Sequence, residues 1–394
     1  MRILTAYVVR EVGGVFLVTL ALLTTLMVVF GVGKEAAQQG LGFVHIAQLI
    51  PFLLPNALLF AVPGTILFAV SMVYGRMSGG NEIVAIKAMG ISPMVLLWPT
   101  LFIAVVLSFV TVWLNDVATS WGYQGVQRVV INAVEDIAYG LLRTNKSYSN
   151  KMFSVNVKRV EGRKLIHPTF SFRATADEPM VTITAEEAEL RSNPGSGMLT
   201  VICRNGTVNA GGMTYDFPDT FEQEVSLDAA SKKGSSSESP SHMPLRALPA
   251  RVAQQRLAIE RFEQEQAAQA AYQMLTGDLG RLTGSQWAIN SVVMQDKWNQ
   301  LYRLQTETPR RWANGFSCLC FTLIGAAIAI RFRNSDVLST FGICFIPILI
   351  FYYPLMIYGV DRSKAGAFPP LSVWLANVVL IACGLWVLRK VVRY

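Results

Sequence analysis

The segment between the second and third apolar stretches of the chain carries the residues with the clearest chemical use. It reads GRMSGGNEIVAIKAMGISP and covers residues 75–93. Asn81 is a preferred N-cap residue, Glu82 follows in the first turn where the helix dipole stabilises an anion, and Gly90 with Pro93 is a typical stop. The segment therefore predicts a two-turn helix over residues 82–89.

This short helix is too apolar to be fully solvated. Its apolar residues are Ile83, Val84, Ile86 and Met89. We expect them to pack against the membrane surface or against another protein. The chemistry on offer is docking, through an apolar face and the carboxylate of Glu82. An amphipathic helix that rests on the membrane without a protein partner is the alternative interpretation.

Residues for catalysis or metal binding do not cluster in the sequence. His45, His167 and His242 are scattered, and no ligand spacing links them to the five cysteines. Only Cys203 lies outside the apolar stretches, so no disulfide is expected. The polar parts show no nucleophile or paired-carboxylate motif, and no G-x-x-x-x-G-K-[ST] loop for ATP occurs. We expect neither an enzyme nor a bound cofactor.

The elements that position the docking segment are expected to be membrane helices. The chain is 52% hydrophobic and only 15% charged over 394 residues, which is too apolar for an ordinary soluble protein. Stretches without Asp, Glu, Lys or Arg that can cross a bilayer are residues 12–32, 46–74, 95–114, 312–330, 337–360 and 367–388. The first is too long for a cleaved signal peptide. We predict six transmembrane helices.

Basic residues set the orientation of these helices, because Lys and Arg of short loops stay on the cytoplasmic side. One face collects Arg2, Arg10, Arg76, Lys87, Arg331, Arg333, Arg389, Lys390 and Arg393, and the other only Lys34, Arg362 and Lys364. Both termini are therefore expected in the cytoplasm. The net charge of +8 follows from this topology and does not indicate a nucleic-acid partner.

The long segment between the third and fourth stretches is then extracytoplasmic. Period-two alternation, beginning at Phe153, Val155 and Val157, predicts many short strands, with Asn205-Gly206 as a hairpin turn. The pattern favours a sandwich, a jelly roll or an open barrel-like sheet. A flexible Ser-rich linker begins near residue 229, and residues 250–274 and 286–306 have helical composition, as two surface helices or a hairpin.

These patterns define four parts of the chain. They are residues 1–114 with the first three membrane helices and the short helix 82–89, residues 115–228 with a jelly-roll-like all-β domain, residues 229–311 with the linker and helices, and residues 312–394 with the last three membrane helices. The predicted fold class is an α-helical membrane protein with an inserted extracytoplasmic β domain and extra helices.

The docking segment resembles the coupling-helix region of the LptF/LptG (YjgP/YjgQ) permease family. In that family a Pro-containing second span leads through an Arg, a small residue and a Glu to a short helix that ends in Gly. The corresponding residues here are Pro63, Arg76, Ser78, Glu82 and Gly90.

Three further segments are similar to the same family. They are the approach to the fourth span with Tyr302, Arg303 and Pro309, the last span with Pro369, Pro370, Trp374 and Asn377, and the strand-turn-strand pattern ITAEEAELRSNPGSGMLTVICRNGTV. The resemblance covers the chain except for residues 229–284, which form a longer insertion than the family leads us to expect.

The resemblance implies a permease subunit of an ABC transporter in the bacterial inner membrane. Such a subunit extracts lipopolysaccharide and passes it to a periplasmic bridge of LptC/LptA-like proteins. It implies a separate LptB-like ATPase and a second LptF/LptG-type permease subunit as partners. The docking helix would then contact the ATPase, through Arg76, Glu82, Ile83, Ile86, Met89 and Gly90.

The resemblance also suggests where substrate would bind. Lys34 lies just beyond the first span, where its ammonium could contact a lipid-A phosphate, or could simply reach the interface. Phe16, Leu20, Leu23 and Met27 share a face that could line an acyl cavity, contact lipid or pack internally. Pro347 and Pro354 in the fifth span could permit the bending of a lateral gate.

Other function classes fit the sequence less well but are not removed by it. An ABC exporter subunit for another lipid or for lipoproteins usually has its external domain after one span instead of three. A membrane-anchored envelope scaffold would need no ATPase. A secondary transporter is disfavoured because the six stretches contain no Asp, Glu, Lys or Arg that could couple ion movement.

Overall fold

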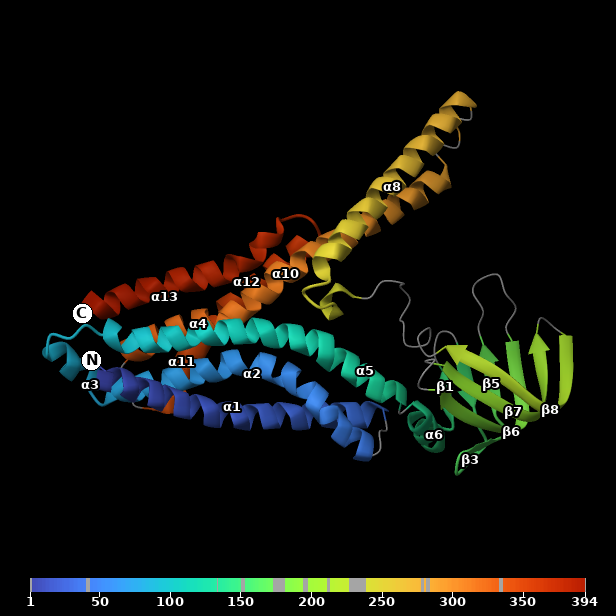
Figure 1. Cartoon of the computed structure of the whole chain (residues 1–394), viewed down its shortest axis with the longest axis horizontal. Helices are drawn as coiled ribbons and strands as arrows, with labels where there is room; N and C mark the ends of the chain where they lie inside the picture. The colour runs from blue at the N-terminus through green and yellow to red at the C-terminus, as the bar shows by residue number, and fades with distance from the viewer. Residues whose placement is uncertain are drawn as a thin grey trace. The chain divides into compact units, whose positions relative to one another are not determined.

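A computed structural model of the 394-residue chain describes residues 2–39, 43–132, 134–149, 153–172, 181–193, 198–210, 213–226, 239–277, 280, 284–332 and 336–393. The chain divides into two compact units, which Figure 1 draws with helices and strands labelled. The membrane unit comprises Met1–Leu26, Leu54–Ser120 and Ser239–Tyr394. The sheet unit comprises Met27–Leu53 and Trp121–Glu238.

Six helices among the described residues are long and apolar enough to cross a membrane. They are Ile3–Gly33, Ala47–Gly79, Met94–Val126, Trp287–Phe332, Leu338–Lys364 and Pro370–Val391. Each overlaps one stretch predicted from the sequence, so the predicted six spans with an inserted β domain are confirmed.

The spans are built from long helices with two π-helical turns. The helices are α1 (Arg2–Gln39), α2 (Phe43–Gly79), α4 (Met94–Val117), α10 (Ser285–Phe332), α11 (Val337–Pro347), α12 (Tyr353–Lys364) and α13 (Leu375–Arg393). The π turns are Ala118–Gly122, which follows α4, and Ile348–Tyr352, which joins α11 to α12. A 3₁₀ turn, Pro370–Trp374, leads into α13.

Helix α10 lies at the centre of the membrane unit, where it packs against α4, α11, α12 and α13. Its span is the most buried of the six, because 83% of the residues in its most apolar part are buried. Small residues such as Cys318, Ala327 and Ala329 are fully buried along it. Small side chains let helix backbones approach closely, which is how membrane helices gain packing energy.

The predicted helical hairpin is present, with one difference. Helix α8 (Leu248–Leu275) lies alongside the first part of α10 (Figure 1), and Gln255 Nε2 donates to the Lys297 carbonyl at 3.0 Å. The second predicted helix, 286–306, does not end before the fourth span, because α10 continues from Ser285 to Phe332 with Pro309 inside. The intervening charged residues pair with one another while remaining helical, as described below.

The sheet unit holds an antiparallel sheet of eight strands within the described residues. After α5 (Tyr123–Asn132) and α6 (Val134–Asn145) come β1 (Ser147–Ser149), β2 (Phe153–Asn156), β3 (Arg159–Glu161), β4 (Lys164–Ile166), β5 (Thr169–Phe172), β6 (Val181–Asn193), β7 (Met198–Ala210) and β8 (Met213–Ser226). Strand β6 pairs with β5, the last strand of the series β1-β2-β5, and with β4 of the hairpin β3-β4. It also pairs with β7, which pairs with β8. Residues 227–238, where the predicted linker begins, lie outside the described part.

One face of the sheet forms a core with α6. Leu165, Ile183 and Cys203 are buried there together with Tyr139 of α6. The Tyr139 hydroxyl donates to the Arg163 carbonyl at 2.6 Å and accepts from the Leu190 N–H at 2.8 Å. This pair of bonds fixes α6 to the sheet.

The Asn205-Gly206 pair is not a hairpin turn, and that prediction is wrong. It lies inside β7, where Asn205 has φ 48° and the pairing with β8 shifts between Arg204 and Gly206. A Cβ atom at Gly206 would lie 2.2 Å from the Thr184 carbonyl oxygen. Left-handed backbone and close approach need the same residue types as a tight turn, so the sequence signal is shared by a bulge.

Candidate functional site

The docking segment forms helix α3 (Glu82–Ala88) between α2 and α4. Asn81 occupies the N-cap position, but its side chain makes no capping hydrogen bond, which corrects the expectation drawn from its residue type. Its φ of 60° shows its actual role, because asparagine adopts left-handed backbone more readily than most residues. Gly90, with φ 76°, ends the helix: Gly90 N bonds to the Lys87 carbonyl and Ile91 N to the Ile86 carbonyl.

Helix α3 turns one apolar face inward and the other outward. Ile83 and Ile86 are only 4% and 6% exposed and belong to the core of the membrane unit. Val84 is 38% exposed and Met89, just after the helix, is 66% exposed. Thus Ile83 and Ile86 anchor the helix to its own chain, and Val84 and Met89 are available for an outside contact.

Polar contacts hold α3 and the last turn of α2 against the ends of two spans. Lys87 Nζ donates to the Val391 carbonyl of α13 at 2.6 Å. In the preceding helix, the buried Ser78 hydroxyl donates to the Ile330 carbonyl of α10 at 2.8 Å. Lys87 thus links α3 to α13, and Ser78 links the end of α2 to α10.

Unlike Lys87 and Ser78, the Glu82 carboxylate has no polar partner among the described residues. It is half-buried, and within the described part of the chain it forms neither a hydrogen bond nor an ion pair. A carboxylate at the start of a helix is stabilised by the helix dipole and can still accept from an external donor. It is the only acidic residue of α3, so it is the natural electrostatic contact of this surface.

Arg76, which was predicted beside Glu82, is already paired within the chain. Its Nη2 lies 2.8 Å from Glu11 Oε2 of α1. The two side chains are 50% and 32% exposed, so the pair contributes little stability by itself. Its effect is positional, since it ties the beginning of α1 to the last turn of α2.

The predicted apolar face of α1 is the packed face. Phe16 is buried in the core of the membrane unit, Leu20 packs against that core, and Leu23 and Met27 are half-buried. The opposite face is open, with Val18 and Leu22 at 72% and 70% exposure. Lys34 falls within α1, but its side chain lies outside the described ones.

Pro347 and Pro354 flank the π turn Ile348–Tyr352 in the fifth span. A π turn inserts an extra residue into the helical ladder, and proline removes a backbone donor, so the backbone is irregular here. Large apolar side chains on this stretch are exposed: Leu349, Ile350 and Phe351 at 52%, 56% and 64%. The irregular turn thus has an uncovered apolar surface.

A buried ionic cluster that the sequence analysis missed lies where α10 meets the segment 239–247, which we call the strap. Arg311 and Glu307 of α10 are both buried, at 0% and 1% side-chain exposure. Arg311 Nη2 donates to the Met243 carbonyl at 2.6 Å, and to the Pro240 and Ser241 carbonyls at 3.4 Å and 3.3 Å.

Further contacts close the cluster from both sides. Arg310 pairs with Glu307 at 2.7 Å, and the Ser241 hydroxyl donates to Glu307 Oε1 at 3.1 Å. On α4, Asp116 Oδ1 accepts from the Leu245 N–H at 2.7 Å and lies 3.7 Å from Arg311 Nη1. The cluster therefore clamps the strap to two spans.

One sequence signal could have identified this cluster. Glu307 stands three and four residues before Arg310 and Arg311, and such spacings bring opposite charges together on one helix. The helix predicted over residues 286–306 ends just before these three residues. Asp116 is remote in sequence, so its contribution depends on tertiary packing.

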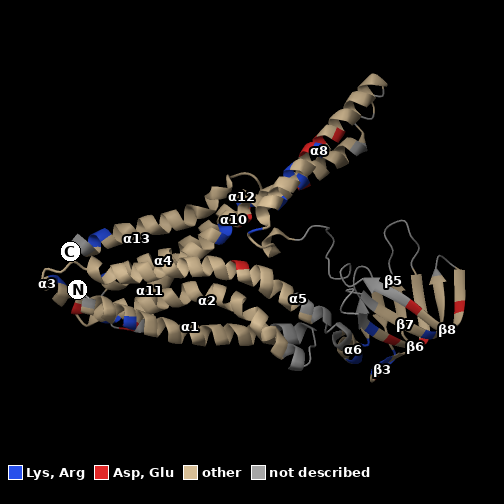
Figure 2. Ribbon diagram, in the orientation of Figure 1, with Lys and Arg blue, Asp and Glu red and all other residues tan. Residues whose placement is uncertain are grey.

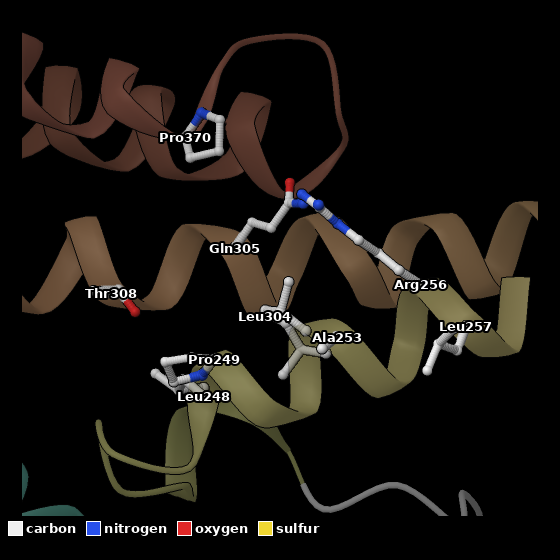
Figure 3. A pocket seen from close by; sticks show the side chains of 10 residues that line it. Leu248, Pro249, Ala253, Arg256, Leu257, Leu304, Gln305, Thr308 and Pro370 are labelled. Atoms are coloured by element: carbon white, nitrogen blue, oxygen red, sulfur yellow. The ribbon is translucent and has the colours of Figure 1, made fainter.

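An apolar groove lies at the base of the hairpin formed by α8 and α10. Figure 3 shows its side chains, which come from α8, from α10 and from Pro370. Leu248, Val252 and Leu304 are among the lining residues, and Arg256 is the one charged residue there. The groove has a volume of about 820 Å³.

Comparison with known proteins matches the chain to a protein family. The family described as lipopolysaccharide export system permease LptF/LptG matches residues 6–390. No curated protein matches the chain.

Proposed function

The chain belongs to the LptF/LptG family of lipopolysaccharide export permeases, and from this premise we propose that it is the membrane subunit of an ABC transporter. It extracts lipopolysaccharide, or a closely related lipid, from the bacterial inner membrane and passes it to an LptC/LptA-like periplasmic bridge. An LptB-like cytoplasmic ATPase supplies the energy. A second LptF/LptG-type subunit completes the transmembrane cavity.

The observation that carries the proposal is the surface of α3. Glu82 lacks a partner among the described residues, Val84 and Met89 are exposed beside it, and Gly90 fixes the end of the helix. An apolar helix face with one unpaired carboxylate fits a hydrophobic groove that has a basic residue at its rim. Arg76, Ile83 and Ile86 support this surface from behind, through their contacts to α1 and to the core.

The substrate path runs along the first and fifth spans. On α1, the half-buried Leu23 and Met27 contact the acyl chains, whereas Phe16 and Leu20 pack in the core and hold that part of the helix in place. Lys34 meets a phosphate at the periplasmic rim. The π turn between Pro347 and Pro354 serves as the lateral gate, because its irregular backbone permits bending and its exposed apolar side chains can contact acyl chains. The sheet unit receives the extracted lipid on the periplasmic side.

The test is co-purification of the tagged full chain in mild detergent, compared with Glu82→Ala. Loss of one partner of a desolvated charge pair costs roughly 2–5 kcal/mol, so we expect the ATPase to be lost or its hydrolysis to be uncoupled. Glu260→Ala, which removes an exposed carboxylate of α8, is the matched control and should keep the ATPase. Absence of any ATPase with the unmodified chain, while other complexes survive, would support the envelope scaffold instead.

A further inference from the structure

A small pocket lies next to α3, and three of its lining residues are basic. Lys87 of α3, Arg331 of α10 and Lys390 of α13 surround a volume of about 160 Å³. No acidic residue lines it; the other lining residues are Ser78, Ile83, Val84, Ile330 and Val391. Figure 2 shows the basic residues at the end of α13.

The three cations have donors to spare. Lys87 gives one N–H to the Val391 carbonyl, at 2.6 Å. Lys390 Nζ lies 3.7 Å from the ring centroid of Trp386, a contact that leaves its N–H groups able to donate elsewhere. Arg331 forms no ion pair with the described residues. Three cations without a carboxylate at one small pocket create a positive potential that favours an anion.

The position of the pocket identifies the anion. It lies where α10 and α13 end, and the excess of basic residues on this face predicts that it is cytoplasmic. We therefore expect the pocket to lie at the level of the lipid headgroups. Trp386 and Phe332 are 60% and 56% exposed next to it, and aromatic residues are enriched at the headgroup level. Basic pockets between spans on this side suit phosphate headgroups.

We propose that Lys87, Arg331 and Lys390 bind the phosphate of an anionic phospholipid from the cytoplasmic leaflet. The bound headgroup neutralises the three cations and links α3 to the ends of α10 and α13. The docking helix is thereby sensitive to the surrounding lipid. This proposal does not depend on the identity of the transported lipid or on an ATPase.

The test uses the purified full chain in an uncharged detergent, with thermal unfolding followed during titration. The probes are dioleoyl phosphatidylglycerol, dioleoyl phosphatidylcholine and inorganic phosphate. The variant Arg331→Gln/Lys390→Gln removes two pocket charges and leaves the Lys87 anchor intact. Arg10→Gln/Arg389→Gln removes two exposed charges from the same face and is the matched control.

We expect phosphatidylglycerol to stabilise the unmodified chain at concentrations about tenfold lower than phosphatidylcholine. The pocket variant should lose this preference, and the control should retain it. Equal stabilisation by both lipids, or an unchanged preference in the pocket variant, would overturn the proposal. Stabilisation by inorganic phosphate without a lipid preference would overturn the assignment to a lipid headgroup. So would loss of a co-purified ATPase from the pocket variant with its lipid preference unchanged, since the pocket would then contact protein.

Discussion

At the scale of single residues, Arg311 is the residue that holds the strap to α10. A fully buried guanidinium must have its charge compensated, and here three strap carbonyls and two carboxylates surround it. Arg310 stands next in sequence but is 25% exposed and contacts only Glu307 within the cluster. The two arginines thus differ in burial and not in charge.

Replacing Arg311 by Met should therefore destabilise the protein far more than replacing Arg310 by Met. Arg311→Met leaves the three strap carbonyls without their donor, and it removes the buried cation that lies 3.8 Å from Glu307 and 3.7 Å from Asp116. Breaking a buried pair costs about 3–5 kcal/mol. Thermal unfolding in detergent measures the difference. Equal losses for the two variants would show that the strap is not held by Arg311.

His242, within the strap, gives this region a pH dependence. Burial lowers the pKa of His242, with Arg311 acting in the same direction and Glu307 opposing it. The folded state therefore binds fewer protons than the unfolded state below the ordinary His pKa of about 6.5, and the strap loses stability as the pH falls through that value.

We expect proteases to cleave the strap faster at pH 5.5 than at pH 7.5, by a larger factor in the unmodified chain than in His242→Gln. Limited proteolysis with a protease active at both values, followed by mass spectrometry of the cleavage sites, makes the comparison. A pH effect of the same size in both proteins would assign it to other groups.

At the scale of elements, the fifth span contains a π turn, which we propose as the lateral gate. Pro347 and Pro354 flank a π turn, and a sequence can indicate the prolines but not the extra residue between them. A flexible turn is needed only if this span moves during transport.

Replacing both prolines by Ala should regularise the span and impair transport without dissociating the complex. We expect ATPase co-purification to be unchanged and ATP-dependent transfer of lipid to a bridge protein to fall several-fold. Pro309→Ala, in the long helix α10, is the comparison variant and should affect stability more than transfer. Unchanged lipid transfer by the double variant would show that this turn is not the lateral gate.

Elements show what a sequence can and cannot predict. The six spans were predictable because apolar length alone determines them, and the end of α3 because Gly90 is needed for a positive φ. The Asn205-Gly206 pair was misread because a bulge and a hairpin turn demand the same residues. Which of the apolar residues of α3 faced inward could not be predicted, since Ile83 and Ile86 are buried by spans distant in sequence.

At the scale of the whole molecule, family membership shows a permease of lipopolysaccharide export, and the α3 surface supports our proposal that a separate ATPase drives it. The central claim is that the exposed side of α3, and not its buried side, meets that ATPase. Val84 and Met89 mark the exposed side, and Ile86 marks the buried one.

The most direct measurement is site-specific photo-crosslinking in membranes, with a photoreactive residue placed at Met89 or Val84, and at Ile86 and Leu257 as controls. We predict that positions 84 and 89 capture a soluble ATP-binding subunit. Positions 86, which is buried, and 257, which is exposed on α8, should not. Failure of both α3 positions to capture such a subunit, or equal capture from position 257, would contradict the account.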